Sequence, residues 1–193
     1  MTTYVDATAV VEPGAELGDD VVIWQYSKVR SGARVGAETK IGGGVYVGAD
    51  VSVGRRCKIE NGAQVFEGAA LAAGVFVGPG VILTNDRIPR AVTPDGVLKT
   101  ADHWEVTGVT VDEGASLGAG VIVVAGVRVG RWAMVGAGAV VTTDVPDHAL
   151  VLGVPGRRIG WVCRCGHRLP ASGTCPACGR RYDVAPDGIR ELP

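Results

Sequence analysis

Residues 29–53 read VRSGARVGAETKIGGGVYVGADVSV, and an aliphatic residue occupies every sixth position of this stretch. The same spacing extends in both directions, so that Val, Ile or Leu stands at fourteen consecutive sixth positions from Val5 to Leu83. The spacing then stops and resumes in a new phase from Val111 to Val141. A six-residue unit is too short for a hairpin, and a fixed short period is typical of a solenoid whose units stack on one another.

A second inward position follows four residues after each aliphatic residue and is small or medium in size, as at Ala33, Thr39 and Cys57. Twenty of the 30 glycines stand one or three residues after the repeated aliphatic residue, where the backbone turns or packs closely. We therefore expect an all-β chain, a parallel β-helix with three units in each 18-residue coil. Twenty units at about 4.8 Å between stacked strands predict six or seven coils and a rod on the order of 30 Å long.

The composition indicates an ordered protein without a conventional core of large side chains. Apolar residues make up 47% of the chain, but aromatic residues make up only 5%. The formal net charge of −1 provides no positive surface for nucleic acid or an anionic membrane. No apolar run approaches the roughly 18 residues that span a bilayer. The first 17 residues contain the acidic Asp6, Glu12 and Glu16, whereas a signal peptide has basic residues followed by an apolar run. We expect a cytoplasmic protein with no nucleic-acid or membrane partner.

The repeat is suspended between Leu83 and Val109, which predicts an excursion loop at about residues 84–108. A loop of this length inside a compact solenoid is usually functional, although a tolerated insertion without a role is the alternative. The segment concentrates charged residues and contains His103, one of three histidines in the chain. We place the chemistry of the protein in this loop.

The coil period also predicts which polar side chains are neighbours. Glu67 and Asn85 are separated by one full coil, so they occupy the same position of successive coils, and Asp86 follows directly. We expect these three residues to converge where the loop leaves the rod, together with Glu60 and Asn61 from the preceding corner. The alternative is that Glu67 and Asn85 form only a solvated ladder.

Nearly all of residues 1–160 resemble the hexapeptide-repeat acyltransferases, and residues 58–91 are similar to the branch that N-acetylates amino sugars carried on nucleoside diphosphates. The matching segments are Ile59-Glu60-Asn61, Val65-Phe66-Glu67-Gly68, Val77-Gly78-Pro79 and Thr84-Asn85-Asp86-Arg87-Ile88-Pro89-Arg90-Ala91. The resemblance implies a left-handed β-helix over residues 1–156 and a homotrimer with active sites between subunits. Outward apolar residues lend the trimer some support, and they are Tyr46, Ile82, Ile122 and Val140.

The coil period, side-chain chemistry and the resemblance together give candidate roles for individual residues. The candidate catalytic residues are Asn85, Glu67, Asp86 and His103, and the candidate substrate-binding residues are Glu60, Asn61, Phe66, Arg87 and Arg90. In the similar branch the Asn that matches Asn85 orients the sugar amine, and no dedicated catalytic His is present. An amine can attack a thioester directly if it is held and relieved of its proton. Either Asp86 or His103 could take that proton, although a lone loop histidine is more often merely exposed.

The second run of repeats resembles the coenzyme A half of the same family. The residues that this similarity assigns to acetyl-CoA are Gly120, Ala125, Gly126, Ala137, Gly138, Arg157 and Arg158. Small residues let an extended pantetheine arm approach the backbone, and the two arginines could pair with phosphates or could be solvated surface charges. The family usually has Pro-Ala-Arg where this chain has Pro155-Gly156-Arg157.

Residues 157–193 lack the repeat and look like a zinc ribbon. The candidate metal ligands are Cys163, Cys165, Cys175 and Cys178, in two close pairs. The first pair has one intervening residue in place of the usual two, which leaves His167 as a substitute ligand. Four thiolates leave no open position for catalysis, so we expect structural zinc, against the alternative of free thiols.

The function that these observations favour is transfer of an acetyl group from acetyl-CoA to the amine of a UDP- or dTDP-linked amino sugar. The alternatives are a CoA-dependent acyltransferase for another small amine or hydroxyl, and a non-catalytic trimeric β-helix that binds a protein. A metal-dependent hydratase of the carbonic-anhydrase type is disfavoured because the three histidines are not spaced to meet on adjacent coils.

Overall fold

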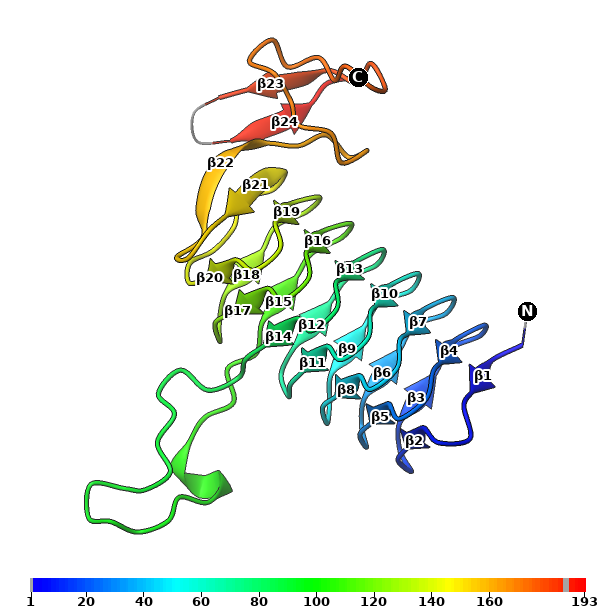
Figure 1. Cartoon of the computed structure of the whole chain (residues 1–193), viewed down its shortest axis with the longest axis vertical. Helices are drawn as coiled ribbons and strands as arrows, with labels where there is room; N and C mark the ends of the chain where they lie inside the picture. The colour runs from blue at the N-terminus through cyan, green and yellow to red at the C-terminus, as the bar shows by residue number, and fades with distance from the viewer. Residues whose placement is uncertain (1, 186–187) are drawn as a thin grey trace.

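The computed structural model describes residues 2–185 and 188–193 and shows a rod of stacked coils that carries one long loop and a small tail (Figure 1). Each coil contributes short strands to three sheets, and strands of neighbouring coils pair in parallel. The predicted all-β parallel β-helix is therefore confirmed, while the left hand of its coils stays a prediction. Within the described ranges the only helix is the 3₁₀ helix η1 (Ala101–His103). None of the helical structure found there is long and apolar enough to cross a membrane.

The strands divide among three sheets of the rod and a hairpin of the tail. The first sheet contains β1 (Tyr4–Val5), β4 (Val22–Ile23), β7 (Lys40–Ile41), β10 (Lys58–Ile59), β13 (Phe76–Val77), β16 (Ser116–Leu117), β19 (Met134–Val135), β21 (Ala149–Leu152) and β22 (Arg157–Trp161). The second contains β2 (Val10–Val11), β5 (Lys28–Val29), β8 (Tyr46–Val47), β11 (Gln64–Val65), β14 (Ile82–Leu83), β17 (Ile122–Val123) and β20 (Val140–Val141). The third contains β3 (Glu16–Leu17), β6 (Arg34–Val35), β9 (Ser52–Val53), β12 (Ala70–Leu71), β15 (Thr110–Val111) and β18 (Arg128–Val129). The tail adds β23 (Tyr182–Val184) and β24 (Ile189–Glu191).

Strand pairing follows the expected period. Ile59 pairs with Ile41 of the preceding coil on one side and with Val77 of the following coil on the other. The first sheet contains eight parallel strands, so the rod has about eight turns rather than six or seven. The additional rungs come from residues after Val141, because β21 joins the first sheet although it no longer follows the six-residue spacing.

The core is a stack of aliphatic side chains. From Ile23 to Leu83, and again from Val111 to Val141, every repeated aliphatic residue is buried. The small inward positions are buried as well, and the hydroxyl of Thr39 donates a 2.9 Å hydrogen bond to the Gly54 carbonyl. Burial of many Val methyl groups thus replaces a core of large side chains.

The turn three residues after most strands of the rod is left-handed whether or not glycine occupies it. Gly44 has φ of 66°, and Glu38 and Trp132 adopt φ of 62° and 56° at the same turn position. The N–H of Glu38 donates to the Asp19 carbonyl at 2.8 Å, so contact with the preceding coil holds a conformation that non-glycine residues seldom adopt. The glycine pattern therefore predicted the turn but not every residue that adopts it.

The loop and the tail depart from the rod in different ways. Val65 pairs with Leu83 at the regular period, but Leu83 pairs with Val123, so the coil that carries the loop is more than twice as long as a regular coil. Figure 1 shows this segment as an arm that projects from the side of the rod, while the tail lies across its end. The tail begins with β22, which pairs antiparallel with β21 in the first sheet. The domain boundary at residue 157 stays a prediction, and strand pairing continues across it.

Candidate functional site

The arm leaves and rejoins the rod at one narrow neck. The hydroxyl of Thr84 accepts a hydrogen bond from the Ala125 N–H at 2.8 Å and donates to the Val123 carbonyl at 3.2 Å. One residue later, the Asn85 carbonyl accepts from the Thr107 N–H at 2.9 Å. These bonds tie the start of the arm to its end and to the coil that follows, so residues at the neck have a fixed position.

Glycine is required on the returning side of the neck. A Cβ atom at Gly108 would collide with the backbone carbonyl of Gly68, on the preceding coil. Because the obstacle is backbone and not a flexible side chain, any larger residue would force the two coils apart. Gly108 thus lets the chain re-enter the stack directly beside Gly68.

The strands that precede Glu67 and Asn85 are in register on successive coils. Val65 is paired with Leu83, and Glu67 and Asn85 follow these strands by two residues on successive coils. Both are half-buried, and Asp86 stands next to them at the start of the arm. The Asp86 Oδ1 atom accepts a 2.8 Å hydrogen bond from the Ile88 N–H, which fixes the first turn of the arm.

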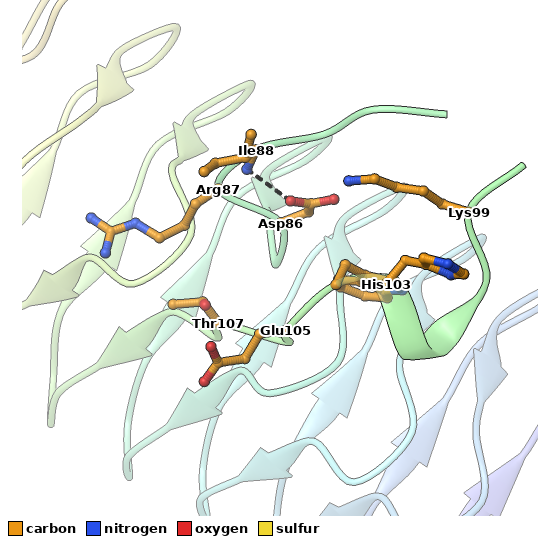
Figure 2. Close-up of a pocket in the computed structure, with 8 residues that line it drawn as sticks. Asp86, Arg87, Ile88, Lys99, His103, Glu105 and Thr107 are labelled. Atoms are coloured by element: carbon orange, nitrogen blue, oxygen red, sulfur yellow. Dashed lines mark hydrogen bonds between the residues drawn. The ribbon is translucent and has the colours of Figure 1, made fainter. Parts of the chain in front are cut away.

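The arm encloses a cavity of about 330 Å³ next to the neck. Its lining residues are Asp86, Arg87, Ile88, Lys99, His103, Trp104, Glu105 and Thr107. In Figure 2 the Lys99 ammonium points toward the Asp86 carboxylate, while Arg87 extends in the opposite direction. Asp86, Arg87 and His103 were predicted from the sequence, but Lys99, Trp104 and Thr107 were not. Nothing periodic marks them, although a tryptophan next to the only histidine of the loop was an available signal.

The His103 ring, which lines this cavity, is held by Thr100. Its Nδ1 accepts a hydrogen bond from the Thr100 N–H at 3.0 Å and lies 2.9 Å from the Thr100 hydroxyl. A backbone N–H can only donate, so Nδ1 carries a lone pair and the neutral ring holds its proton on Nε2. In this arrangement Nε2 cannot take a proton from a substrate.

Glu60 and Asn61 do not join Glu67 and Asn85 within one chain, contrary to the expected convergence. They follow β10 in the first sheet, whereas Glu67 follows β11 in the second, so one edge of the prism separates them. Glu60 and Asn61 line a different cavity of about 180 Å³, whose other lining residues include Trp24, Lys40 and Lys58. The Asn61 Oδ1 atom accepts from the Gly43 N–H at 2.8 Å, which is a role in the turn between coils.

The other candidate substrate residues lie in three places. The Phe66 ring lies 5.7 Å from the Tyr46 ring, centroid to centroid, on the outer side of the second sheet. Arg90 lines a separate hollow farther out on the arm. Arg87 reaches back to the rod, because a Cβ atom added to Gly126 would lie only 3.6 Å from its guanidinium carbon. Arg87 therefore connects the arm with a glycine that was assigned to the coenzyme.

The candidate coenzyme residues form three groups. Ala125 and Gly126 lie at the neck, at the same corner as Asn85. Gly120, Ala137 and Gly138 lie at the corner between the first and second sheets, where the Gly138 N–H donates to the Ala119 carbonyl. Arg157 and Arg158 lie on β22 and line a cavity of about 130 Å³ with Asp144 and Gly156. A single chain does not bring these groups into one groove.

The four cysteines of the tail converge as predicted. Their Sγ atoms all lie within 4.8 Å of one another, and none of them is in a disulfide. The fifth cysteine, Cys57, is buried in the coil core. The Arg180 N–H and guanidinium, which hydrogen-bond to the sulfur of Cys178, lower the pKa of that thiol to about 6. His167 lies at the edge of the cluster, with Nδ1 3.5 Å from the Cys165 sulfur.

Comparison with known families matches both runs of repeats. Residues 32–67 match the model described as bacterial transferase hexapeptide (six repeats), and residues 108–143 match the model described as hexapeptide repeat of succinyl-transferase. Both matched segments consist of repeat units of the rod, and nearly all of the arm lies between them.

Curated relatives match part of the chain. The chain is 49% identical over 82 residues to a dTDP-3-amino-3,6-dideoxy-alpha-D-galactopyranose 3-N-acetyltransferase of Aneurinibacillus thermoaerophilus, an alignment that covers 41% of this chain and 42% of the relative. It is 37% identical over 76 residues to a galactoside O-acetyltransferase of Lactococcus lactis, covering 39% of this chain and 36% of the relative. The chain thus spans less than half of the length of the curated relatives that it matches.

Among solved structures, the fold resembles a hexapeptide-repeat acetyltransferase of Vibrio cholerae that was determined with acetyl coenzyme A. The TM-score is 0.54 at 20% identity, over 68% of this chain and 72% of the other. At this level of identity the similarity supports the fold alone.

Proposed function

Because the chain belongs to the hexapeptide-repeat acyltransferase family, we propose that it transfers an acetyl group from acetyl-CoA to the amine of a nucleoside-diphosphate-linked amino sugar. The acceptor class is a UDP- or dTDP-linked 3-amino or 4-amino deoxysugar. The observation that supports this proposal is the neck, where Thr84 binds the Ala125 N–H and the strands before Glu67 and Asn85 are in register on successive coils. A polar set suited to an amine thus lies next to small residues suited to an extended coenzyme arm.

In the proposed reaction the sugar amine attacks the thioester carbon directly. The new bond joins nitrogen to the acetyl carbon, the carbon–sulfur bond breaks, and coenzyme A leaves as the thiol. Asn85 and Glu67 hold the amine so that its lone pair faces the carbonyl, which converts a bimolecular encounter into an oriented one.

Asp86 is the proposed acceptor of the amine proton. Its carboxylate lines the cavity beside the neck, and in Figure 2 the Lys99 side chain points toward it. His103 is the rival base, but its Nδ1 is engaged by the Thr100 N–H and its Nε2 holds the proton. We therefore assign His103 to orientation of the sugar or diphosphate through a hydrogen bond donated by Nε2.

We further propose that the active assembly is a homotrimer. The outward residues Tyr46, Ile82, Ile122 and Val140 all lie on the second sheet, and Ile82, Ile122 and Val140 are in direct register. The arm exposes Ile88 and Leu98, at 74% and 71%. Docking of one subunit beside another would cover these surfaces and would let two corners from different chains form one coenzyme groove.

The test is a spectrophotometric assay for free thiol released from acetyl-CoA, with UDP- and dTDP-linked 3-amino and 4-amino sugars as acceptors. We expect turnover with at least one of them and none with the matched hydroxyl sugar. Transfer only to hydroxyl sugars would favour the second candidate, an O-acetyltransferase, which the Lactococcus relative supports. No thiol release with any acceptor would favour a non-catalytic trimer.

Asn85→Ala tests the site itself. Loss of an orienting group at the reacting amine is expected to lower kcat/KM by about 100-fold. The matched control is Ser52→Ala, an exposed outward position on β9 of the third sheet, which should leave kcat/KM unchanged. Equal activity of Asn85→Ala and the native chain would refute the role of Asn85.

A further inference from the structure

The cysteine cluster is built by two tight turns that aim four sulfur atoms at one point. In the first turn the Gly166 N–H donates to the Cys163 carbonyl at 2.8 Å, and Gly166 has φ of 90°. In the second turn the Gly179 N–H donates to the Cys175 carbonyl at 3.0 Å, and Gly179 has φ of 74°. Left-handed backbone at a glycine reverses the chain within a few residues, so both cysteines of each pair face inward. The arrangement is that of a four-thiolate metal site.

Hydrogen-bond donors of two side chains, Tyr182 and Arg180, reach sulfur atoms of the cluster. The Tyr182 oxygen accepts a hydrogen bond from the Arg164 N–H at 3.1 Å, so its own O–H can donate to the Cys163 sulfur at 3.2 Å. Arg180 donates to the Cys178 sulfur at 3.3 Å. Donors aimed at metal-bound sulfur are typical of the shell around a thiolate site, where they orient the ligands.

The same groups connect the cluster to the last coils of the rod. The His148 ring stacks edge-on against Tyr182 at 5.3 Å, and its Nδ1 donates to the Val162 carbonyl at 2.9 Å. The Arg164 guanidinium lies 4.4 Å from the centre of the Trp132 ring, which belongs to the turn between β18 and β19. Residues on either side of ligand Cys163 therefore contact two different turns of the rod.

Two of the ligands belong to the hydrophobic core itself. Cys163 and Cys175 are each 1% exposed and pack in one cluster with the coil residues, together with Trp161, Leu169 and Tyr182. The strand β22 pairs with β21 at the end of the first sheet. Without β22, that edge of β21 would be unpaired. An exposed sheet edge is a site for association with other chains.

We propose that Cys163, Cys165, Cys175 and Cys178 bind one Zn²⁺ ion, and that the filled site is a clamp that fastens the tail across the last two coils and covers the end of the first sheet. Zn²⁺ is the metal that tetrahedral thiolate sets favour, and a site closed by four protein ligands holds no substrate. Binding energy of the metal becomes folding energy of the tail, because the cluster exists only when both turns are in place. This proposal does not depend on the acyltransferase activity.

The first test is metal content of the full chain, with the cobalt form as a probe of the ligands. We expect one zinc per chain, and the cobalt-substituted protein should show the intense thiolate charge-transfer absorption of a four-sulfur site. Cys178→Ser should lose most of the metal, whereas Cys57→Ala, which removes the cysteine outside the cluster, should retain one zinc. Native protein without metal, or a Cys178→Ser variant that keeps it, would overturn the metal site.

The second test addresses the clamp by amide hydrogen exchange. Removal of zinc by a chelator should speed amide exchange in residues 149–162 by at least about tenfold and leave β4 to β14 unchanged. Tyr182→Phe should retain zinc but show an intermediate increase, because it loses the O–H to sulfur hydrogen bond and the acceptor of the Arg164 N–H while all four cysteines remain. Equal exchange in residues 149–162 with and without zinc would overturn the clamp, whatever the outcome of the acetyl-transfer assay.

Discussion

The coils from β1 to β20 and the arm of residues 84–108 are parts of one chain that are stabilised differently. Inside the stack a strand pairs with the coil before it and the coil after it, and from β4 onward a buried aliphatic residue stands at the same place in each coil. In the arm no residue is buried, and order comes from a few hydrogen bonds such as Thr93 N–H to Val97 carbonyl at 2.8 Å. Repetition supplies stability but makes all coils alike, so a unique chemical site arises where the repetition is broken.

The largest effect is expected from removing the arm. Since the Asn85 carbonyl and the Thr107 N–H are 2.9 Å apart, a short Gly-Ser linker can replace residues 87–106 without moving the coils. Acetyl transfer should fall by at least about 1,000-fold, because several positioning groups are lost together. Thermal unfolding by circular dichroism should shift by only a few degrees. A variant that unfolds, or one that keeps its activity, would contradict the division between coils and arm.

A core substitution should have the opposite result. Ile59 is 1% exposed, so Ile59→Ala should lower the free energy of unfolding by about 2–5 kcal/mol, as measured by denaturant titration. Lys58→Ala, at the exposed neighbouring position of β10, should change it by less than about 0.5 kcal/mol. Similar values for the two variants would mean that aliphatic stacking does not stabilise the coils.

Gly108→Ala tests the junction of the two regions. Its Cβ atom would strike the Gly68 backbone, so we expect a loss of about 1–3 kcal/mol in the free energy of unfolding. Gly188→Ala is the control, because the added Cβ would meet open space in the tail. If Gly108→Ala were as stable as the control, the close approach of the two coils at the neck would be unnecessary.

The smallest effect concerns a surface charge on the coils. Glu12 receives hydrogen bonds from Arg30 at 2.8 Å and from the Ser31 N–H, and these lower its pKa to about 2. A lowered carboxyl pKa stabilises the fold above its unfolded value of about 4.5, and that stabilisation is lost as the pH falls toward 2. Glu12→Gln should therefore lower Tm slightly at pH 7, and the difference should vanish near pH 2. Ser52→Ala, which removes no titratable group, should show no such dependence on pH.

The regular part of the molecule was largely predictable because the same sequence separation recurs between the residues that contact each other in successive coils. Aliphatic spacing predicted the buried stack, and the coil period predicted the register of Val65 with Leu83. The same reasoning could not place Glu60, because the period gives the neighbours along one face and not the separation between two corners. It also missed Lys99 and Thr107, whose positions depend on how the arm folds back on its own neck.

The sequence by itself determined the sheets, the register and the convergence of the four cysteines, since these follow from short fixed spacings that act between adjacent units. Tertiary structure decided what has no period: the closure of the arm at Asn85 and Thr107, the reach of Arg87 to Gly126, and the docking of Arg164 on Trp132. Each of these is a contact between segments of unrelated sequence. Their geometry is set by packing of the whole chain, because neither partner carries a pattern that specifies the other.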